Sequence, residues 1–192
     1  MEFKLLGQKQ NPNCTDCPLH KSSKHVCIMG RGNPKAKIFL IGEAPGSAEE
    51  LTGKPFMGRA GKLLNHLLEE LGIQDDVYIS NVCKCRPPEN RKPTYDEVKI
   101  CCPYLIHELH AVVPEVIVLL GKAAMQFVDL KRPLAKDRLS AASLPIRFKY
   151  FYALNDVLVI PTWHPAYCLR RGTGATNDLR KALKIAKIKA HQ

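Results

Sequence analysis

The stretch KIFLIGEAPG (37–46) decides the fold that this sequence predicts. It begins with an apolar run typical of a buried strand and ends in a tight turn that contains Gly42, Pro45 and Gly46. A second glycine-punctuated loop follows and leads into a helical pattern. Because ligands of open α/β sheets bind at the carboxyl ends of the strands, we expect the functional site to lie at this turn.

Three more apolar runs share this character, and helical patterns alternate with them. The predicted strands are 37–41, 77–80, 115–120 and 157–161, and the predicted helices are 59–71, 94–111, 121–128 and 176–190. The alternation indicates βαβ units around a central parallel sheet. Thr94 and Glu97 predict a capping box at the start of the second helix. Residues 129–147 interrupt the alternation, and we predict a loop there.

The length of 192 residues favours a single domain over 1–192. Its first 36 residues show no periodicity and need an anchor, for which Cys14 and Cys17 are candidates. The chain contains no run of about 18 apolar residues, and its amino terminus has no secretory signal. We therefore expect a cytoplasmic monomer without a membrane span.

The charge of the chain is strongly basic. Twenty-nine Lys and Arg residues against eighteen Asp and Glu residues give a net charge of +11. Such a charge on a domain of this size indicates a polyanionic partner such as nucleic acid, since phosphate neutralisation dominates non-specific binding. The alternative is a lysine-rich surface with no such partner.

Eight cysteines in an intracellular chain indicate metal or redox chemistry rather than disulfides. Cys14 and Cys17 form a C-x-x-C pair, and a second group lies downstream. That second group consists of Cys83, Cys85, Cys101 and Cys102. Zinc and an iron–sulfur cluster both accept four thiolates, so the spacing leaves both possible.

The turn after the first strand carries a carboxylate, Glu43, and the loop beyond it carries Phe56 directly after a proline. A phosphate-binding loop is the alternative for such a turn, but it depends on backbone N–H groups and gains nothing from a carboxylate. A carboxylate beside an aromatic ring suits a cationic transition state and a flat ring to stack.

Two more polar loops follow predicted strands and should face the same cleft. In NVCKCRPPENRKP (81–93), Asn81 offers a donor and an acceptor that can read a base edge, although turn chemistry is the alternative role. Arg86 and Arg91 in this proline-rich loop are suited to gripping a phosphodiester backbone. In PTWHPAY (161–167), His164 lies between Trp163 and Pro165.

Together these loops resemble family 4 of the uracil-DNA glycosylase superfamily, the iron–sulfur enzymes. The segments that carry the resemblance are GEAPG (42–46), GKPFMGRAGKLL (53–64), NVCKCRPPENRKP (81–93) and HPAYCLR (164–170), with Cys101 downstream of the third. The resemblance implies a three-layer αβα fold with a central four-stranded parallel sheet. It also implies hydrolysis of the N-glycosidic bond of deoxyuridine in single- or double-stranded DNA.

The resemblance further implies a structural [4Fe-4S] cluster in its own lobe. The implied ligands are Cys14, Cys17, Cys85 and Cys101. Cys102 is adjacent to the last of these and is the alternative ligand.

The same resemblance assigns roles to residues of the cleft. Phe56 stacks on the flipped uracil, Asn81 binds its pairing edge, and Glu49 lies against C5, where a thymine methyl group would collide. Backbone groups of Glu43, Ala44 and Pro45 line the pocket.

For the chemistry, the resemblance implies that His164 stabilises negative charge at O2 of the uracil. Glu43 faces the sugar, where it balances a cation or orients water, and Asn90 is a second candidate for placing that water. The implied DNA contacts are Arg86, Arg91, Leu169 and Arg170.

Two rival interpretations stay open. The superfamily type that becomes covalently trapped on DNA carries a Gln where this chain has Ala44, and it has a histidine-bearing insertion before the final motif. Residues 129–147 contain no histidine. A non-catalytic, metal-stapled DNA-binding module would leave Glu43 and His164 with structural roles only.

Overall fold

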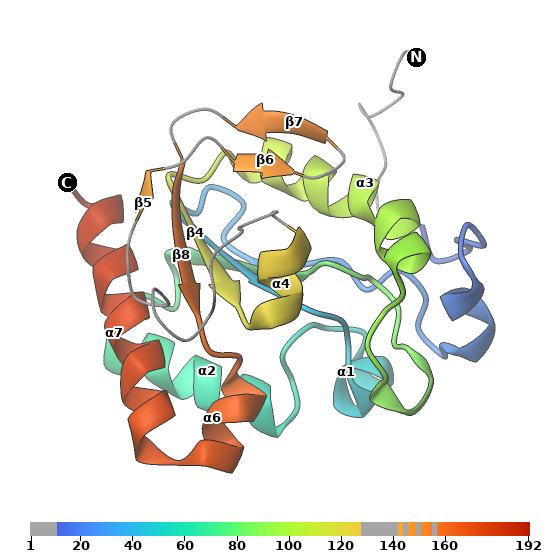
Figure 1. The fold of residues 1–192 in the computed structure, drawn as a ribbon, viewed down its shortest axis with the longest axis horizontal. Helices are drawn as coiled ribbons and strands as arrows, with labels where there is room; N and C mark the ends of the chain where they lie inside the picture. Colours follow the sequence, from blue (N-terminus) through green and yellow to red (C-terminus); the bar gives the residue numbers. More distant parts are fainter. Residues whose placement is uncertain (1–10, 128–141, 144–145, 149–150, 155–156) are drawn as a thin grey trace.

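The computed structural model describes residues 11–127, 142–143, 146–148, 151–154 and 157–192 (Figure 1). In this part of the chain, a six-stranded sheet has the order β1-β3-β2-β4-β8-β5. Its strands are β1 (Arg31–Gly32), β2 (Ile38–Gly42), β3 (Val77–Asn81), β4 (Val116–Leu120), β8 (Leu158–Thr162) and β5 (Ala142–Ser143). The four central strands are parallel, and the two short edge strands pair antiparallel.

The four predicted strands are therefore confirmed, each within one residue at either end. The edge strands β1 and β5 were not predicted, because two residues carry no periodicity. The predicted loop at 129–147 is wrong where it meets β5 and β6 (Ile146–Phe148), which pairs with β7 (Phe151–Leu154). Residues 129–141 and 144–145 of that prediction lie outside the described residues.

The helices follow the predicted order. They are η1 (Pro18–Ser22), α1 (Ser47–Thr52), α2 (Arg59–Glu70), η2 (Pro88–Asn90), α3 (Tyr95–Val112), α4 (Lys122–Phe127), α6 (Pro165–Arg171) and α7 (Thr173–Ala190). The capping box of α3 is confirmed, since Thr94 Oγ1 accepts the N–H of Glu97 and the Glu97 carboxylate accepts the N–H of Thr94 at 2.7 Å. The short helices α1 and α6 were not predicted. None of the described helices is both long and apolar enough to cross a bilayer.

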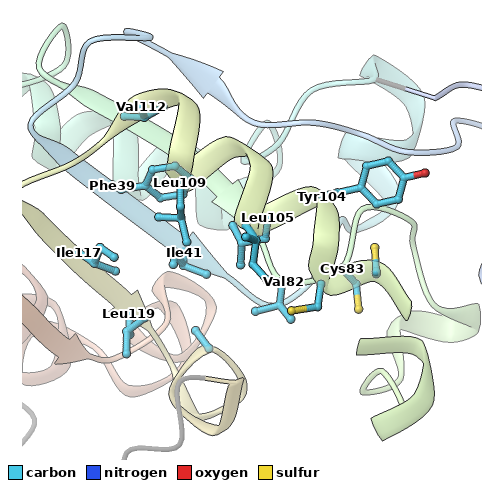
Figure 2. Close-up of a cluster of buried hydrophobic side chains, with 14 of the residues drawn as sticks. Phe39, Ile41, Val82, Cys83, Tyr104, Leu105, Leu109, Val112, Ile117 and Leu119 are labelled. Carbon is cyan, nitrogen blue, oxygen red and sulfur yellow. The ribbon is translucent and has the colours of Figure 1, made fainter. Parts of the chain in front are cut away.

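Successive side chains of the central strands point to opposite faces of the sheet. Phe39 and Ile41 of β2 pack with α3 on one face, in the cluster that Figure 2 shows. Ile38 and Leu40 pack on the other face, in a cluster that includes side chains of α2 and α7. Helices therefore cover both faces of the sheet, and the expected three-layer αβα arrangement is confirmed.

The parallel register brings the ends of the strands to one edge of the sheet. Gly42 at the end of β2 lies opposite Asn81 at the end of β3, and Leu120 of β4 lies opposite Thr162 of β8. Gly121 follows β4 with φ of +87°, and a Cβ added there would lie 2.9 Å from the Cβ of His164. A glycine at this position lets the loop after β8 close over the sheet edge.

Candidate active site

A cavity of about 950 Å³ lies at this edge, between the loops that follow β2, β3 and β8. All eight residues that the sequence placed around the uracil or in the chemistry line it. They are Glu43, Ala44, Pro45, Glu49, Phe56, Asn81, Asn90 and His164. The expected DNA contacts Arg91 and Arg170 also line the cavity, whereas Arg86 and Leu169 are not among its lining residues.

The floor of the cavity is built around Gly42. A Cβ on this residue would lie 2.4 Å from Asn81 Oδ1 and 2.6 Å from Phe56 Cζ, so only glycine leaves room for both side chains. Asn81 is 3% exposed and Phe56 is 5% exposed. Phe56 also adopts φ of +57°, an uncommon conformation for an aromatic residue that surrounding contacts must maintain. We call this part of the cavity, where the amide of Asn81 and the ring of Phe56 meet beside Gly42, the slot.

Glu49, in the first turn of α1, ties together the two loops that frame this slot. One carboxylate oxygen accepts the N–H of Gly46 at 3.0 Å. The other accepts the N–H groups of Met57 and Gly58 at 2.7 and 2.8 Å. The sequence indicated a side chain that faces the ligand and gave no sign of these backbone contacts, because Met57 and Gly58 are distant in sequence. Glu49 lines the cavity while its oxygens hold the loops.

His164 is the N-cap of α6, and its Nδ1 accepts the N–H of Ala166 at 3.1 Å. In the neutral ring the proton is therefore on Nε2. Burial and, to a smaller extent, the charge of Arg170 lower the pKa of His164 to about 4, while the charge of Glu49 acts in the opposite direction. The ring centroid lies 5.9 Å from that of Phe56. At neutral pH, His164 is thus an uncharged hydrogen-bond donor beside the slot.

Glu43 follows β2 directly, and its backbone carbonyl accepts the N–H of Cys83 at 3.0 Å. Burial raises the pKa of its carboxyl group above the ordinary 4.5, and the charge of Lys92 counteracts part of this increase. Among the described residues, no hydrogen bond or ion pair to the Glu43 carboxylate is present. Asn90 lies across the cavity, where its Oδ1 accepts the Nε–H of Arg86 at 2.9 Å.

The two arginines of the loop after β3 are paired with carboxylates of low exposure. Arg86 donates to Glu50 at 2.7 Å, and Arg91 makes two hydrogen bonds to Glu97 at 2.6 and 2.8 Å. The Arg86 contact holds the pKa of Glu50 below its usual value, and Arg91 does the same for Glu97. The sequence did not indicate either pairing. The remaining cations around the cavity are Arg59, Lys62, Lys92 and Arg170.

All eight cysteines are buried and free. Burial raises the pKa of Cys17, and the thiols of Cys101 and Cys14 raise it further. The pKa of Cys85 is raised to about 12, mainly by burial and also by the neighbouring thiols of Cys101 and Cys17, while the hydrogen bond from the N–H of Cys27 acts in the opposite direction. The four expected ligands thus lie close enough to interact electrostatically. In the described residues, no group of three or more His, Cys, Asp or Glu side chains is arranged to hold a metal ion.

Three of these four sulfurs accept hydrogen bonds. The N–H of Lys84 donates to Cys101 Sγ at 3.1 Å, and the N–H of Cys27 donates to Cys85 Sγ at 3.3 Å. The hydroxyl of Tyr104 donates to Cys14 Sγ at 3.4 Å. Such donors stabilise negative charge on a thiolate.

The fold and the cleft define an α/β protein with a site at the carboxyl ends of its parallel strands, and a sequence model described as the uracil DNA glycosylase superfamily matches residues 29–187. The chain belongs to this superfamily. It is 44% identical over 182 residues to a Type-4 uracil-DNA glycosylase of Thermotoga maritima, which covers 94% of this chain and 88% of that protein. It is 51% identical over 160 residues to a Type-4 uracil-DNA glycosylase of Archaeoglobus fulgidus, covering 83% and 79% of the two chains.

A Type-5 uracil-DNA glycosylase of Thermus thermophilus is 35% identical over 144 residues, covering 66% of this chain and 63% of that protein. The resemblance to family 4 inferred from the loop motifs is confirmed by these comparisons.

Replacing Glu49 by Ala should loosen the loops around the slot, because three backbone N–H groups lose a charged acceptor. Hydrogen bonds to charged groups typically contribute about 1.5–3 kcal/mol each. Amide hydrogen exchange at Met57 and Gly58 should therefore accelerate at least roughly tenfold. The control is Glu69→Ala on the exposed side of α2, which should leave both amides protected. Unchanged protection in Glu49→Ala would show that the loops are held by other contacts.

Proposed function

We propose that this chain is a monofunctional uracil-DNA glycosylase that flips uracil out of DNA and hydrolyses its N-glycosidic bond, leaving an abasic site. The observation that carries the proposal is the convergence of Asn81, Phe56, His164 and Glu43 on one cavity, each suited to a different part of deoxyuridine. The names of the relatives from Thermotoga maritima and Archaeoglobus fulgidus support the same activity.

Recognition is assigned to Asn81 and Phe56 at the base of the slot. The amide of Asn81 can donate to O4 of uracil and accept from its N3–H, whereas cytosine presents the reverse pattern on this edge. Phe56 provides a face on which the base stacks. Glu49, together with the backbone of Ala44 and Pro45, lines the wall where C5 would lie and where a thymine methyl group would need space.

Stabilisation of the leaving group is assigned to His164. As the bond between C1′ and N1 breaks, its electron pair moves into the uracil ring and negative charge develops at O2. A neutral imidazole that lines the cavity and carries its proton on Nε2 can stabilise that charge without having to lose a proton first. The hydrogen bond from Ala166 to Nδ1 supports this tautomer.

The chemistry at the sugar is assigned to Glu43. Its carboxylate balances the cationic character of C1′ or orients the water that attacks there, and the attacking water loses a proton to solvent or to this carboxylate. Asn90 lines the same cavity and is the second candidate for holding the water. The reaction needs no metal ion at these positions, because charge stabilisation comes from the side chains.

DNA binding is assigned to cations around the cavity mouth and to α6. Leu169 is 44% exposed on α6, next to Arg170, and could replace the flipped base in the stack. Arg86 and Arg91 remain the expected contacts to the backbone, although each is already paired with a carboxylate.

A [4Fe-4S] cluster bound by Cys14, Cys17, Cys85 and Cys101 fits the residues present. The four thiols are buried together, and backbone or hydroxyl donors point at three of their sulfurs. A cluster takes each thiolate on a different iron, so its ligands surround a larger volume than one zinc ion does. When bound, the cluster would pin the segment before β1 to α3.

Glu43→Gln and His164→Gln should each slow single-turnover release of uracil from a uracil-containing oligonucleotide. Each contact strengthens as charge develops, so we expect losses on the order of 10²- to 10³-fold, with little change in DNA affinity. The matched controls are Glu69→Gln and His66→Gln, both exposed on α2. If both site variants keep full rates, the chemistry lies elsewhere. If they abolish DNA binding instead, a non-catalytic binding module is favoured.

The pH dependence of single-turnover release should have its acid limb above pH 4.5. Glu43 acts ionised and its pKa is raised by burial, whereas His164 acts neutral and its pKa is lowered to about 4. As the pH falls, Glu43 takes up a proton before His164 does. The residual rate of Glu43→Gln should therefore stay level down to about pH 4. An acid limb near pH 6.5 in both proteins would contradict these assignments.

The purified protein should contain about four iron and four acid-labile sulfide atoms per chain. Cys101→Ala should lose most of this iron, because the variant lacks one of the four thiolates that we expect to bind the cluster. Cys102→Ala is the matched control and should keep the cluster. Iron loss in Cys102→Ala with retention in Cys101→Ala would reverse the ligand assignment.

A further inference from the structure

An ion pair is buried between the slot and the cysteines. Lys84 is 1% exposed and Glu108, on α3, is 3% exposed, and the ammonium group donates to the carboxylate. Removing two charges from water is costly, and a well-packed apolar pair of similar volume is often at least as stable. The position of this pair therefore points to a role other than stability alone.

The ammonium group of Lys84 uses its three donors on three acceptors. Besides the Glu108 carboxylate, it donates to the backbone carbonyl of Asn81 at 2.9 Å and to Ser80 Oγ at 2.6 Å. Ser80 and Asn81 are the last two residues of β3, so Lys84 binds the end of this strand, beside the slot.

Glu108 is itself fixed by several donors. Its Oε1 accepts the N–H of Gly30 at 2.5 Å and the hydroxyl of Tyr78 at 3.4 Å, and its Oε2 accepts the hydroxyl of Ser80 at 2.6 Å. The ammonium group of Lys84 is therefore held against a rigid carboxylate rather than a mobile one.

Asn81 depends on such support, because its side chain must remain available to a ligand. Among the described residues, no hydrogen bond to the Asn81 amide is present. The amide of Asn81 packs against the Cα of Gly42 on one side. This contact limits how closely the two residues approach, but it does not determine the orientation of the amide. The peptide group that follows Asn81 is held at both ends, because the N–H of Val82 donates to the carbonyl of Gly42 at 3.0 Å and Lys84 donates to the carbonyl of Asn81. The orientation of this peptide plane determines the direction in which the Asn81 side chain leaves the backbone, and Lys84 is the side chain that restrains it.

Lys84 also reaches the cysteines. Its backbone N–H donates to Cys101 Sγ at 3.1 Å. Cys101 and Glu108 are seven residues apart on α3, which is two helical turns, so they lie on the same face of that helix. The two contacts with α3 thus hold both the main chain and the side chain of Lys84 in place.

We propose that Lys84 is a positioning residue for uracil recognition: anchored to Glu108, it fixes the carbonyl of Asn81 and thereby aims the Asn81 amide at the pairing edge of the base. This inference rests on the proposed function, since it assigns a cause to the recognition that the function requires.

The test compares five variants by single-turnover uracil release and by inhibition with free uracil. Lys84→Met should weaken both, on the order of 10- to 100-fold, as Asn81→Ala does, because reading a base edge with two hydrogen bonds typically contributes that much discrimination. The double variant Lys84→Met/Asn81→Ala should be no slower than Asn81→Ala alone, since both changes remove one interaction. Lys37→Met, which breaks the exposed pair with Glu115, is the matched control and should behave as the wild type.

Lys84→Met leaves the Glu108 charge buried without its partner and lowers thermal stability for that reason alone. The variant Lys84→Met/Glu108→Gln removes this charge and should recover the melting temperature while uracil release and inhibition stay weak. Recovery of both together, or losses that multiply in Lys84→Met/Asn81→Ala, would overturn the positioning role. A wild-type protein that releases no uracil would refute the proposed function itself, whereas an active wild type with an equally active Lys84→Met would refute only this inference.

Discussion

The close approach of three segments of the chain at Gly42 is the constraint on which the rest of the site depends. Parallel pairing sets Gly42 beside Asn81, and the loop after α1 brings Phe56 over the same Cα. Only a residue without a side chain permits this packing. Glu49 then fixes the flanking loops, because its carboxylate accepts hydrogen bonds from their backbone N–H groups while its side chain also lines the cavity.

Burial raises the pKa of Glu43 and lowers the pKa of His164, and both shifts favour the uncharged form of the side chain. For His164 this is the form that can donate a hydrogen bond at neutral pH. For Glu43, burial raises the pKa of the carboxyl group, and the charge of Lys92 counteracts part of that increase. Loss of contact with water therefore shifts the pKa values of an imidazole and a carboxyl group in opposite directions within one cavity.

The four central strands could be predicted because each is an almost continuous apolar run. The loops that follow these runs indicated which residues would line the cavity, and the roles of those residues stay predictions. The short elements α1, α6, β1 and β5 could not be predicted, since tertiary contacts rather than periodicity define them. The pairs of Arg86 with Glu50 and of Lys84 with Glu108 join residues 36 and 24 positions apart. Such pairings depend on the assembled fold, and no local pattern in the sequence reports them.

The ion pairs of the loop after β3 change what the net charge of +11 means for DNA binding. A guanidinium already matched by a carboxylate presents little net charge to a phosphate group. We therefore expect Arg86 and Arg91 to contribute less to counterion release than two unpaired arginines would. The other cations that we expect to meet the phosphates are those that line the cavity, Arg59, Lys62, Lys92 and Arg170. Glu50 and Glu97 lower the net positive charge of this loop, so we expect it to attract the phosphates of undamaged DNA less strongly than two unpaired arginines would.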